Sequence, residues 1–398
     1  MSTKEKLVTI VIPYYNASKT IEDTLMSICI QSMKSVVDVI IVDDASNKTE
    51  YEKLIKIVKK FKKYLDVDYI HYDENRGPGY ARQKGLDMCK HKYVMFMDGD
   101  DVLATSTALF VLINELEKDD KCQIISSNFI EEVRNSKGEY VDMHIHTRDM
   151  TWMFGKLYRL QYLIDNDISF NDSRANEDSG FNAQCILNAQ EGTIKYLDKL
   201  TYCWNYNVSS ITKNNDYNYN GLKGYIENHT WCVHRVYRHY LDTHDNNGSG
   251  IISNIVNHVL KTFTMIYLYR MELTKNGRSQ EQLNQYDDWA MAYYRDVFIY
   301  FKFYFNNENI RDIYFLVSKN HQKMIDNFIL PFNIFQYIDY LNNKMLDELD
   351  VMQILDADKN LVGYVKKEDK DKIDPNNPDL NIIIKPKDIN EHLKTYYS

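Results

Sequence analysis

Short apolar runs alternate with amphipathic stretches over the first 130 residues. Four of these runs have the length of buried strands: 7–12, 36–42, 67–72 and 93–97. Three intervening stretches carry apolar residues at helical spacing: 18–31, with Ser18 as the predicted N-cap, 51–64 and 80–89. The alternation continues with a helix and a strand at 105–116 and 123–129. Because near-continuous apolar strands joined by helices are typical of parallel sheets, the pattern predicts a Rossmann-like α/β domain with helices on both faces.

The regular alternation weakens after about residue 130. The sequence favours an edge strand at 139–146 and helices at 152–166 and 183–189. The remainder becomes mostly helical and aromatic, and ends in a charged stretch with a clear loop at 374–378. We therefore predict an α/β domain, a helical, aromatic-rich domain and a charged tail or small subdomain, with the bounds 1–220, 221–346 and 347–398.

Composition and charge narrow the class of protein. The chain of 398 residues is 44% hydrophobic and 13% aromatic, which is enough for a full core. Acidic residues outnumber basic ones 57 to 48, and this balance argues against general nucleic-acid binding without excluding a local basic groove. The six cysteines have no CxxC or zinc spacing, which fits a reducing compartment. The first apolar run is too short for a signal-peptide core, and no run approaches about 18 apolar residues, so we expect a soluble, cytoplasmic protein.

The run Asp98-Gly99-Asp100-Asp101 directly follows the fourth predicted strand. Ligands of open α/β sheets bind beyond the carboxyl ends of the strands. Clustered carboxylates at that edge suit Mg²⁺ or Mn²⁺ carrying a diphosphate, because these cations prefer oxygen ligands. Taken alone, such a run is more often a turn at the start of a helix than a metal site. The neighbouring motifs must therefore decide between these two interpretations.

Three further motifs stand at predicted strand ends. They are Pro13-Tyr14-Tyr15-Asn16, Asp43-Asp44-Ala45-Ser46 and the loop from Asn75 to Arg82, which contains Gly77-Pro78-Gly79. The carboxylate of the second motif can accept a hydrogen bond from a nucleobase or a ribose, or can cap the next helix. The glycines of the third allow close backbone approach, and Arg82 can bind a base edge or a phosphate, or pair with Asp98.

In this order, the motifs resemble those of family 2 glycosyltransferases of the GT-A fold. Three later segments match the same family: Gly155-Lys156-Leu157-Tyr158-Arg159, Asn176-Glu177-Asp178 and Tyr206 to Thr212. The resemblance covers about residues 7–215. Within the family, the Gly-Pro-Gly loop followed by an arginine is similar to that of bacterial wall teichoic acid GlcNAc transferases.

The resemblance implies a role for each matching residue. It implies that a UDP-sugar donor is bound by Pro13, Tyr15, Asn16, Asp44, Asn75, Arg82, Asp98, Gly99, Ser209 and Ser210. Asp100, with Asp98, would hold Mn²⁺ or Mg²⁺ at the diphosphate, while Asp101 would cap a following helix. Asp178 would be the general base, with Glu177 beside it. One base without a carboxylate nucleophile implies inversion at the anomeric carbon. The expected reaction is transfer of glucose or N-acetylglucosamine to a hydroxyl acceptor.

Two departures from the family pattern weaken parts of this assignment. Gln83 stands where the family often has asparagine. Tyr206 and Asn207 stand where relatives have an arginine or histidine near the diphosphate, which puts Ser209 and Ser210 in doubt as phosphate ligands.

Two other functions stay open at this point. One is a sugar-nucleotide nucleotidyltransferase, although the glycine-rich basic loop of that class is missing after the first strand. The other is a non-catalytic, sugar-nucleotide-binding interaction protein. The acceptor is also open: a glycan, a teichoic-acid-like polymer, a protein side chain, or a nucleic acid, which the charge disfavours. Peripheral contact with the inner face of the membrane and homo-oligomer formation are further open expectations.

Overall fold

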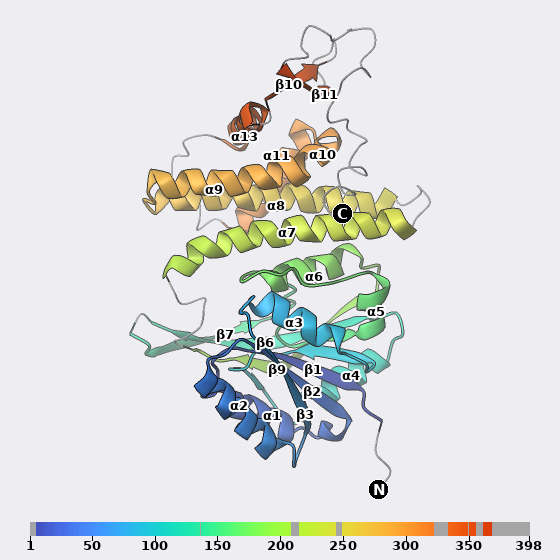
Figure 1. Cartoon of the computed structure of the whole chain (residues 1–398). Helices are drawn as coiled ribbons and strands as arrows, with labels where there is room; N and C mark the ends of the chain where they lie inside the picture. Colours follow the sequence, from blue (N-terminus) through green and yellow to red (C-terminus); the bar gives the residue numbers. More distant parts are fainter. Residues whose placement is uncertain are drawn as a thin grey trace. The chain divides into compact units, whose positions relative to one another are not determined.

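A computed structural model describes residues 5–135, 137–207, 215–243, 249–321, 333–348, 350–355 and 361–367 (Figure 1). The chain forms two compact units, Met1–Cys232 and Val233–Ser398, and the division falls within the helix α7 (Asn215–Thr243). Among the described residues, no helix is both long and apolar enough to cross a membrane.

The first four strands of the N-terminal unit are parallel neighbours. They are β1 (Val8–Tyr14), β2 (Val37–Asp44), β3 (Asp66–Tyr72) and β4 (Tyr93–Phe96), in the spatial order β3-β2-β1-β4. The register places Tyr14 opposite Asp43, and Asp43 opposite His71. The carboxyl ends of these strands therefore lie at one edge of the sheet, where the predicted motifs come together.

The remaining strands of this nine-stranded sheet run in both directions. They are β5 (Val102–Leu103), β6 (Ile124–Arg134), β7 (Tyr140–His146), β8 (Lys156–Arg159) and β9 (Ile194–Trp204). The strand β6 is parallel to β9 but antiparallel to β7 and β8, and β8 is antiparallel to β4. The predicted Rossmann-like α/β class is confirmed, and the mixed strands are confined to the second half of the sheet.

Helices cover both faces of the sheet, as predicted (Figure 1). They are α1 (Ile21–Cys29), α2 (Lys48–Phe61), α3 (Pro78–Asp87), α4 (Ala108–Glu117), α5 (Leu160–Asp165) and α6 (Glu177–Leu187). One buried cluster joins α1, α2 and α4 to alternate β1 residues such as Ile10 and Ile12. A second cluster joins α3, α5 and α6 to the opposite face through Val11 and Phe96.

Three local predictions are wrong. The helix expected at 152–166 is instead β8 followed by α5, because Gly155 adopts a left-handed conformation (φ 64°) and the next residues pair with β6. Ser18 is not an N-cap: Thr20 precedes α1, and the Ser18 amide donates to Glu50 Oε2 at 3.1 Å. Asp101 caps no helix, because β5 follows it directly.

The C-terminal unit is largely helical. Its helices after α7 are α8 (Ser249–Lys275), α9 (Gln280–Tyr293), a π-helical turn (Tyr294–Phe298), α10 (Ile299–Phe301), α11 (Asn307–Asn320) and α13 (Ile334–Glu348). The strands β10 (Val351–Leu355) and β11 (Leu361–Lys366) form a separate antiparallel pair. Buried Arg270 pairs with Asp287, which also accepts a hydrogen bond from Tyr337. The predicted domain bounds remain a prediction.

Close packing of α3 on β1 generates a stability prediction. A Cβ atom added at Gly85 would lie 2.2 Å from Val11 Cγ1, which is itself fully buried. We expect Gly85→Ala to lower the free energy of unfolding by about 1–3 kcal/mol, the usual cost of overpacking. Urea unfolding measures this change. Gly250→Ala in α8 is the matched control, because nothing lies within 4 Å of its added Cβ. Equal stability of the two variants would contradict the packing argument.

Candidate active site

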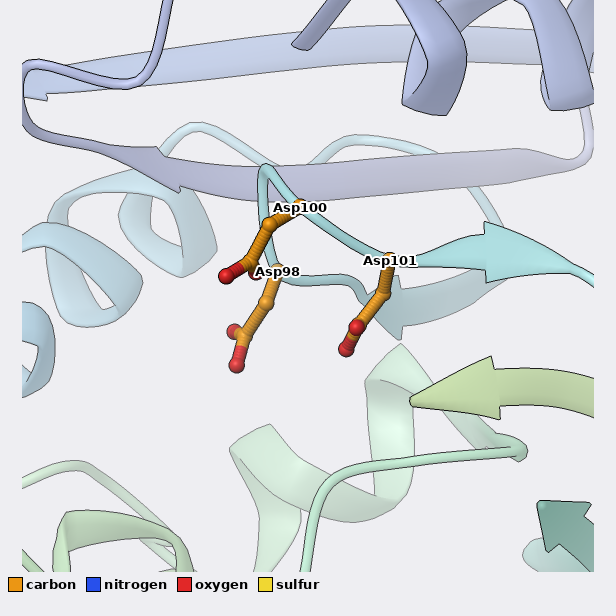
Figure 2. A group of neighbouring side chains, drawn as sticks. All are labelled: Asp98, Asp100 and Asp101. Atoms are coloured by element: carbon orange, nitrogen blue, oxygen red, sulfur yellow. The ribbon is translucent and has the colours of Figure 1, made fainter. Parts of the chain in front are cut away.

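Three carboxylates gather on the loop that follows β4. One oxygen from each of Asp98, Asp100 and Asp101 lies within 4.8 Å of the others. Figure 2 shows the three side chains extending from the same short loop toward one side. The loop begins where β4 ends, so these carboxylates stand at the carboxyl edge of the parallel strands.

The end of β9 supports this aspartate loop. Asp101 is fully buried, and its carboxylate accepts hydrogen bonds from the Tyr202 hydroxyl (2.7 Å) and the Asn205 amide (2.9 Å). Asn207 Nδ2 donates to Asp100 Oδ2 at 2.8 Å. The sequence did not predict these supporting contacts. The only signal was that Asn207 replaces the family's basic residue.

The charges of the aspartate loop favour a divalent cation. Burial, followed by the charge of Asp98, raises the pKa of Asp100, and burial raises that of Asp101 well above its usual range. Burying several like charges together is costly unless a counter-charge compensates them. The oxygen donors of Asp98 and Asp100 fit Mg²⁺ or Mn²⁺, whereas the hydrogen bonds to Asp101 commit it to support of the loop.

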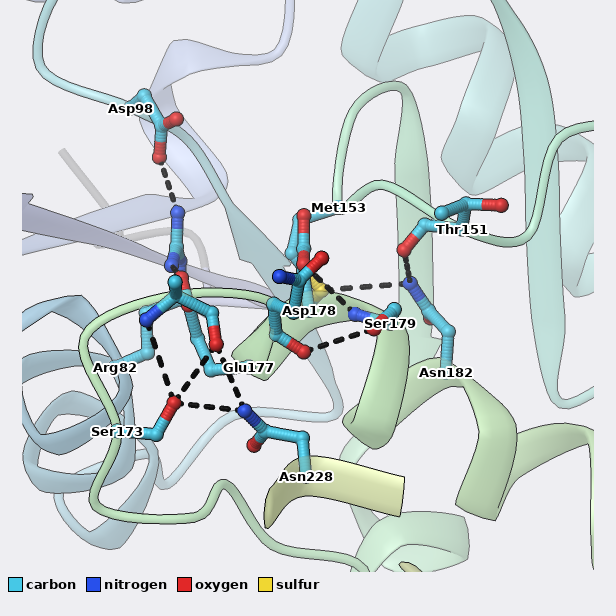
Figure 3. Close-up of polar contacts among 12 residues, drawn as sticks. Arg82, Asp98, Thr151, Met153, Ser173, Glu177, Asp178, Ser179, Asn182 and Asn228 are labelled. Carbon is cyan, nitrogen blue, oxygen red and sulfur yellow. Dashed lines mark hydrogen bonds and ion pairs between the residues drawn. The ribbon is translucent and has the colours of Figure 1, made fainter. Parts of the chain in front are cut away.

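Arg82 connects the aspartate loop to α6. Its guanidinium donates to Asp98 Oδ1 and to Glu177 Oε1, and its side chain is only 5% exposed (Figure 3). Burial alone would lower the pKa of Arg82, but the nearby carboxylates Asp98 and Glu177 outweigh this effect and raise it. Arg82 is therefore paired with two carboxylates in this structure. The pair with Asp98 is one of the three interactions that the sequence left open for Arg82.

Asp178 lies beside this ion pair in the first turn of α6. It is buried, and burial, followed by the charge of Glu177, raises its pKa to about 8. The Ser179 amide donates to Asp178 Oδ1 at 2.8 Å (Figure 3). The other charged or titratable groups that interact with it are Glu177, Arg82, Asp98, Lys156 and Tyr158. A carboxyl group with a pKa near neutrality is suited to accept a proton.

The helix α7 supports the start of α6. Asn228 Nδ2 donates to Ser173 Oγ (2.7 Å) and to the Ala175 carbonyl (2.8 Å). A Cβ atom at Gly180 would lie 2.8 Å from Asn228 Cβ, so the two helices are in close contact there. These contacts fix the segment that leads into Glu177 and Asp178.

Asp44 organises the Gly-Pro-Gly loop. Its two carboxylate oxygens accept from the amides of Arg76 (2.9 Å) and Gly77 (2.6 Å), and Asn75 Nδ2 donates to the Asp44 carbonyl (2.9 Å). Burial raises the pKa of Asp44, while the two amide hydrogen bonds oppose that rise. Gly77 adopts φ 95°, a conformation that favours glycine. The contacts with Asp44 thus hold the loop at the sheet edge.

The other predicted donor-binding residues lie at the same edge or outside the described residues. Pro13 is near the end of β1, and Tyr15, just beyond it, is 53% exposed. Asn16 Oδ1 accepts from both nitrogens of Asn47, which ties β1 to the start of α2. The Gly99 carbonyl accepts from Thr20 Oγ1 at 2.8 Å. The predicted ligands Ser209 and Ser210 fall outside the described residues.

The sheet and the aspartate loop at its carboxyl edge define an α/β protein of the GT-A type. Residues 9–174 match Glycosyl transferase family 2. This matched segment, less than half of the chain, is thus similar to the family that the motifs predicted.

Curated bacterial sequences and solved structures are similar to this chain. The chain is 26% identical to the uncharacterized glycosyltransferase EpsJ of Bacillus subtilis over 52% of its length and 63% of EpsJ. It is 28% identical to the poly(ribitol-phosphate) beta-N-acetylglucosaminyltransferase TarP of Staphylococcus aureus over 48% of its length and 60% of TarP. For TarS of the same species, identity is 27% over 45% of the chain and 32% of TarS. The chain thus spans less than two thirds of each relative.

The structural comparison supports the fold. The crystal structure of S. aureus TarS residues 1–349 in complex with UDP aligns with a TM-score of 0.56 and 19% sequence identity. The alignment covers 89% of this chain and 95% of that one. The predicted GT-A fold with a helix-rich C-terminal region is confirmed by this similarity.

The Arg82 ion pairs generate a second stability prediction. Arg82→Met would leave the carboxylates of Asp98 and Glu177 without their buried counter-charge, so we expect a loss of about 3 kcal/mol in the free energy of unfolding. Urea unfolding at neutral pH tests this. Arg76→Met is the control, because Arg76 pairs with Asp172 at the surface and should contribute little. Similar losses in both variants would be inconsistent with a central role for Arg82.

Proposed function

We propose that this protein is an inverting, metal-dependent glycosyltransferase that moves a sugar from a UDP-sugar to a hydroxyl acceptor. The observation that carries the proposal is that one buried arginine, Arg82, joins the aspartate loop to the helix that bears Asp178. The family match and the similarity to TarS, whose structure contains UDP, support this reading.

The donor would bind along the carboxyl edge of the parallel strands. Pro13, Tyr15 and Asn16 after β1, Asp44 after β2 and Asn75 in the Gly-Pro-Gly loop would surround the nucleoside. Asp98 and Asp100 would hold Mn²⁺ or Mg²⁺, which supplies charge neutralisation to the leaving diphosphate when it is bound. Arg82 would act mainly by fixing Asp98 and Glu177 in place, and Gly99 would shape the loop.

The acceptor hydroxyl would lose its proton to Asp178. As the acceptor oxygen attacks the anomeric carbon, the bond from that carbon to the diphosphate oxygen breaks and UDP leaves. The hydroxyl proton passes to the Asp178 carboxylate, whose raised pKa suits this transfer. Glu177 is already paired with Arg82, so it would support Asp178 rather than attack the sugar. A single displacement inverts the configuration at the anomeric carbon.

The relatives suggest the substrates. TarS and TarP are named for transfer of N-acetylglucosamine to poly(ribitol-phosphate), and a further relative is a poly-beta-1,6-N-acetyl-D-glucosamine synthase of Staphylococcus epidermidis. We therefore propose UDP-N-acetylglucosamine as the first donor to test, with UDP-glucose second. A teichoic-acid-like polymer is the proposed acceptor, and other glycans are the next class.

Removal of the proposed base should abolish transfer. We expect Asp178→Asn to lower kcat by at least about 100-fold without loss of nucleotide binding, because the amide cannot accept the proton. Sugar transfer from UDP-N-acetylglucosamine to a polyol-phosphate polymer measures this. Asp165→Asn, at the end of α5, is the control. For the unaltered protein, kcat/KM should rise as pH increases toward about 8, where the carboxylate form becomes dominant. Undiminished turnover by Asp178→Asn would remove this residue as the base.

Metal and nucleotide binding should depend on Asp100. A ligand that binds only the folded protein raises its thermal stability, so UDP with Mn²⁺ should raise Tm. We expect that increase to disappear in Asp100→Ala and to persist in Asp119→Ala, a control outside the site. If UDP stabilises the protein equally with and without metal, the proposed metal role fails. If no nucleotide stabilises it, the proposed donor site is contradicted.

A further inference from the structure

The Gly-Pro-Gly loop and the segment that leads into α6 are packed backbone against backbone. The Gly79 amide donates to the Ser173 carbonyl at 3.3 Å, and a Cβ atom added at Gly79 would clash with the Asn171 carbonyl oxygen. A Cβ atom at Gly77 would likewise lie 3.0 Å from Arg174 Cα. The loop that is proposed to contact the nucleoside therefore touches the segment that precedes the proposed base.

Two arginines cross this contact in opposite directions. Arg174 Nη1 donates to Asn75 Oδ1 at 2.9 Å, and Arg174 Nη2 donates to the Asn75 carbonyl at 2.7 Å. From the other side, Arg76 pairs with Asp172 and lies over the Tyr80 ring, with its guanidinium carbon 4.1 Å from the ring centroid. Of these two side chains, only that of Arg174 contacts a proposed donor ligand within the described residues.

The contacts of Asn75 fix the orientation of its carboxamide. A guanidinium can only donate hydrogen bonds, so the carboxamide atom that faces Arg174 must be the oxygen. On the other side, Asn75 Nδ2 donates to the Asp44 carbonyl at 2.9 Å, and a carbonyl can only accept. In the described part of the chain, Asn75 Oδ1 has no further protein partner. Loss of Arg174 would therefore leave this carboxamide held on one side only.

The segment that bears Arg174 does not depend on the same contact. Asn228 Nδ2 donates to Ser173 Oγ at 2.7 Å (Figure 3), and it also donates to the Ala175 carbonyl at 2.8 Å. Arg174 itself is exposed, so removal of its side chain creates no cavity in the core. The dependence is therefore one-sided: Arg174 orients Asn75, whereas other residues hold the start of α6.

We propose that Arg174 is a positioning residue for the donor, which fixes the Asn75 carboxamide in the orientation that binds the nucleoside of the UDP-sugar. The inference rests on the proposed function, in which Asn75 contacts that nucleoside. Arg174 belongs to none of the motifs that the sequence singled out. The donor site is then built partly from the chain segment that carries the proposed base.

The affinity for UDP measures this role. We expect Arg174→Met to raise the dissociation constant of UDP with Mn²⁺, measured by titration calorimetry, by about 3–10-fold, because the carboxamide loses an orienting hydrogen bond. Arg174→Lys should raise it similarly, because an ammonium group cannot reproduce the two-pronged contact of a guanidinium. Arg76→Met is the matched control and should change it by less than about twofold, because a surface ion pair contributes little. Full affinity in Arg174→Lys would indicate a role of charge alone and would overturn the proposal.

A double-mutant cycle separates positioning from direct contact with the donor. If Arg174 acts through Asn75, Arg174→Met should have no further effect on UDP binding once Asn75→Ala has removed the carboxamide. An equal effect in both backgrounds would overturn the proposal. In sugar transfer, Arg174→Met should raise KM for the donor and leave kcat at saturating donor unchanged. A lower kcat with unchanged KM would place Arg174 in support of the base instead, and would equally overturn it.

Failure of the proposed function would give a different result. If the unaltered protein binds no UDP with Mn²⁺, the proposed donor site itself is contradicted. If the unaltered protein and Arg174→Met bind UDP equally well, only the role of Arg174 is contradicted. Because Arg174 is exposed, we expect both of its variants to fold, and their Tm without nucleotide checks this.

Discussion

The ion pairs of Arg82 are the interaction on which the candidate site depends. One buried guanidinium joins Asp98, on the loop after β4, to Glu177, at the start of α6. A buried charge that loses its partner is strongly unfavourable, so neither element can move away without the other. Asp44 fixes the loop that leads into α3, the helix of Arg82, through two backbone amides. The geometry between the proposed metal ligands and the proposed base is therefore built into the fold.

The same arrangement leaves the site rich in negative charge. The pKa values of Asp100, Asp101, Glu177 and Asp178 are all raised, and burial is the largest cause for each. A diphosphate approaching these carboxylates would be repelled unless a cation came with it. Binding of the proposed donor and binding of the proposed metal should therefore favour each other. For Asp178, the charge of Glu177 adds to the effect of burial in raising the pKa.

The sequence predicted features that depend on strand ends. Asp44 and Asp98 follow apolar runs, and parallel strands bring their carboxyl ends to one edge, so their grouping could be expected. The contacts of Asp101 could not be expected, because Tyr202 lies in β9 and Asn205 follows it directly, and β9 is a strand of mixed polarity with no continuous apolar run. The ion pair of Arg82 with Glu177 joins residues 95 positions apart, and periodicity carries no information on such a contact.

The contact between α6 and α7 limits where the chain could be shortened without disturbing the candidate active site. The predicted boundary after residue 220 would cut α7 before Asn228, whose side chain supports Ser173 and Ala175 and packs against Gly180. A fragment ending at 220 would keep every proposed ligand of the donor and the metal, yet would lose the support beneath the proposed base. The smallest autonomous enzyme would then have to include this part of α7. The helix α7 lies outside the matched family segment, yet it supports the candidate active site, so the two cannot be separated without loss of that support.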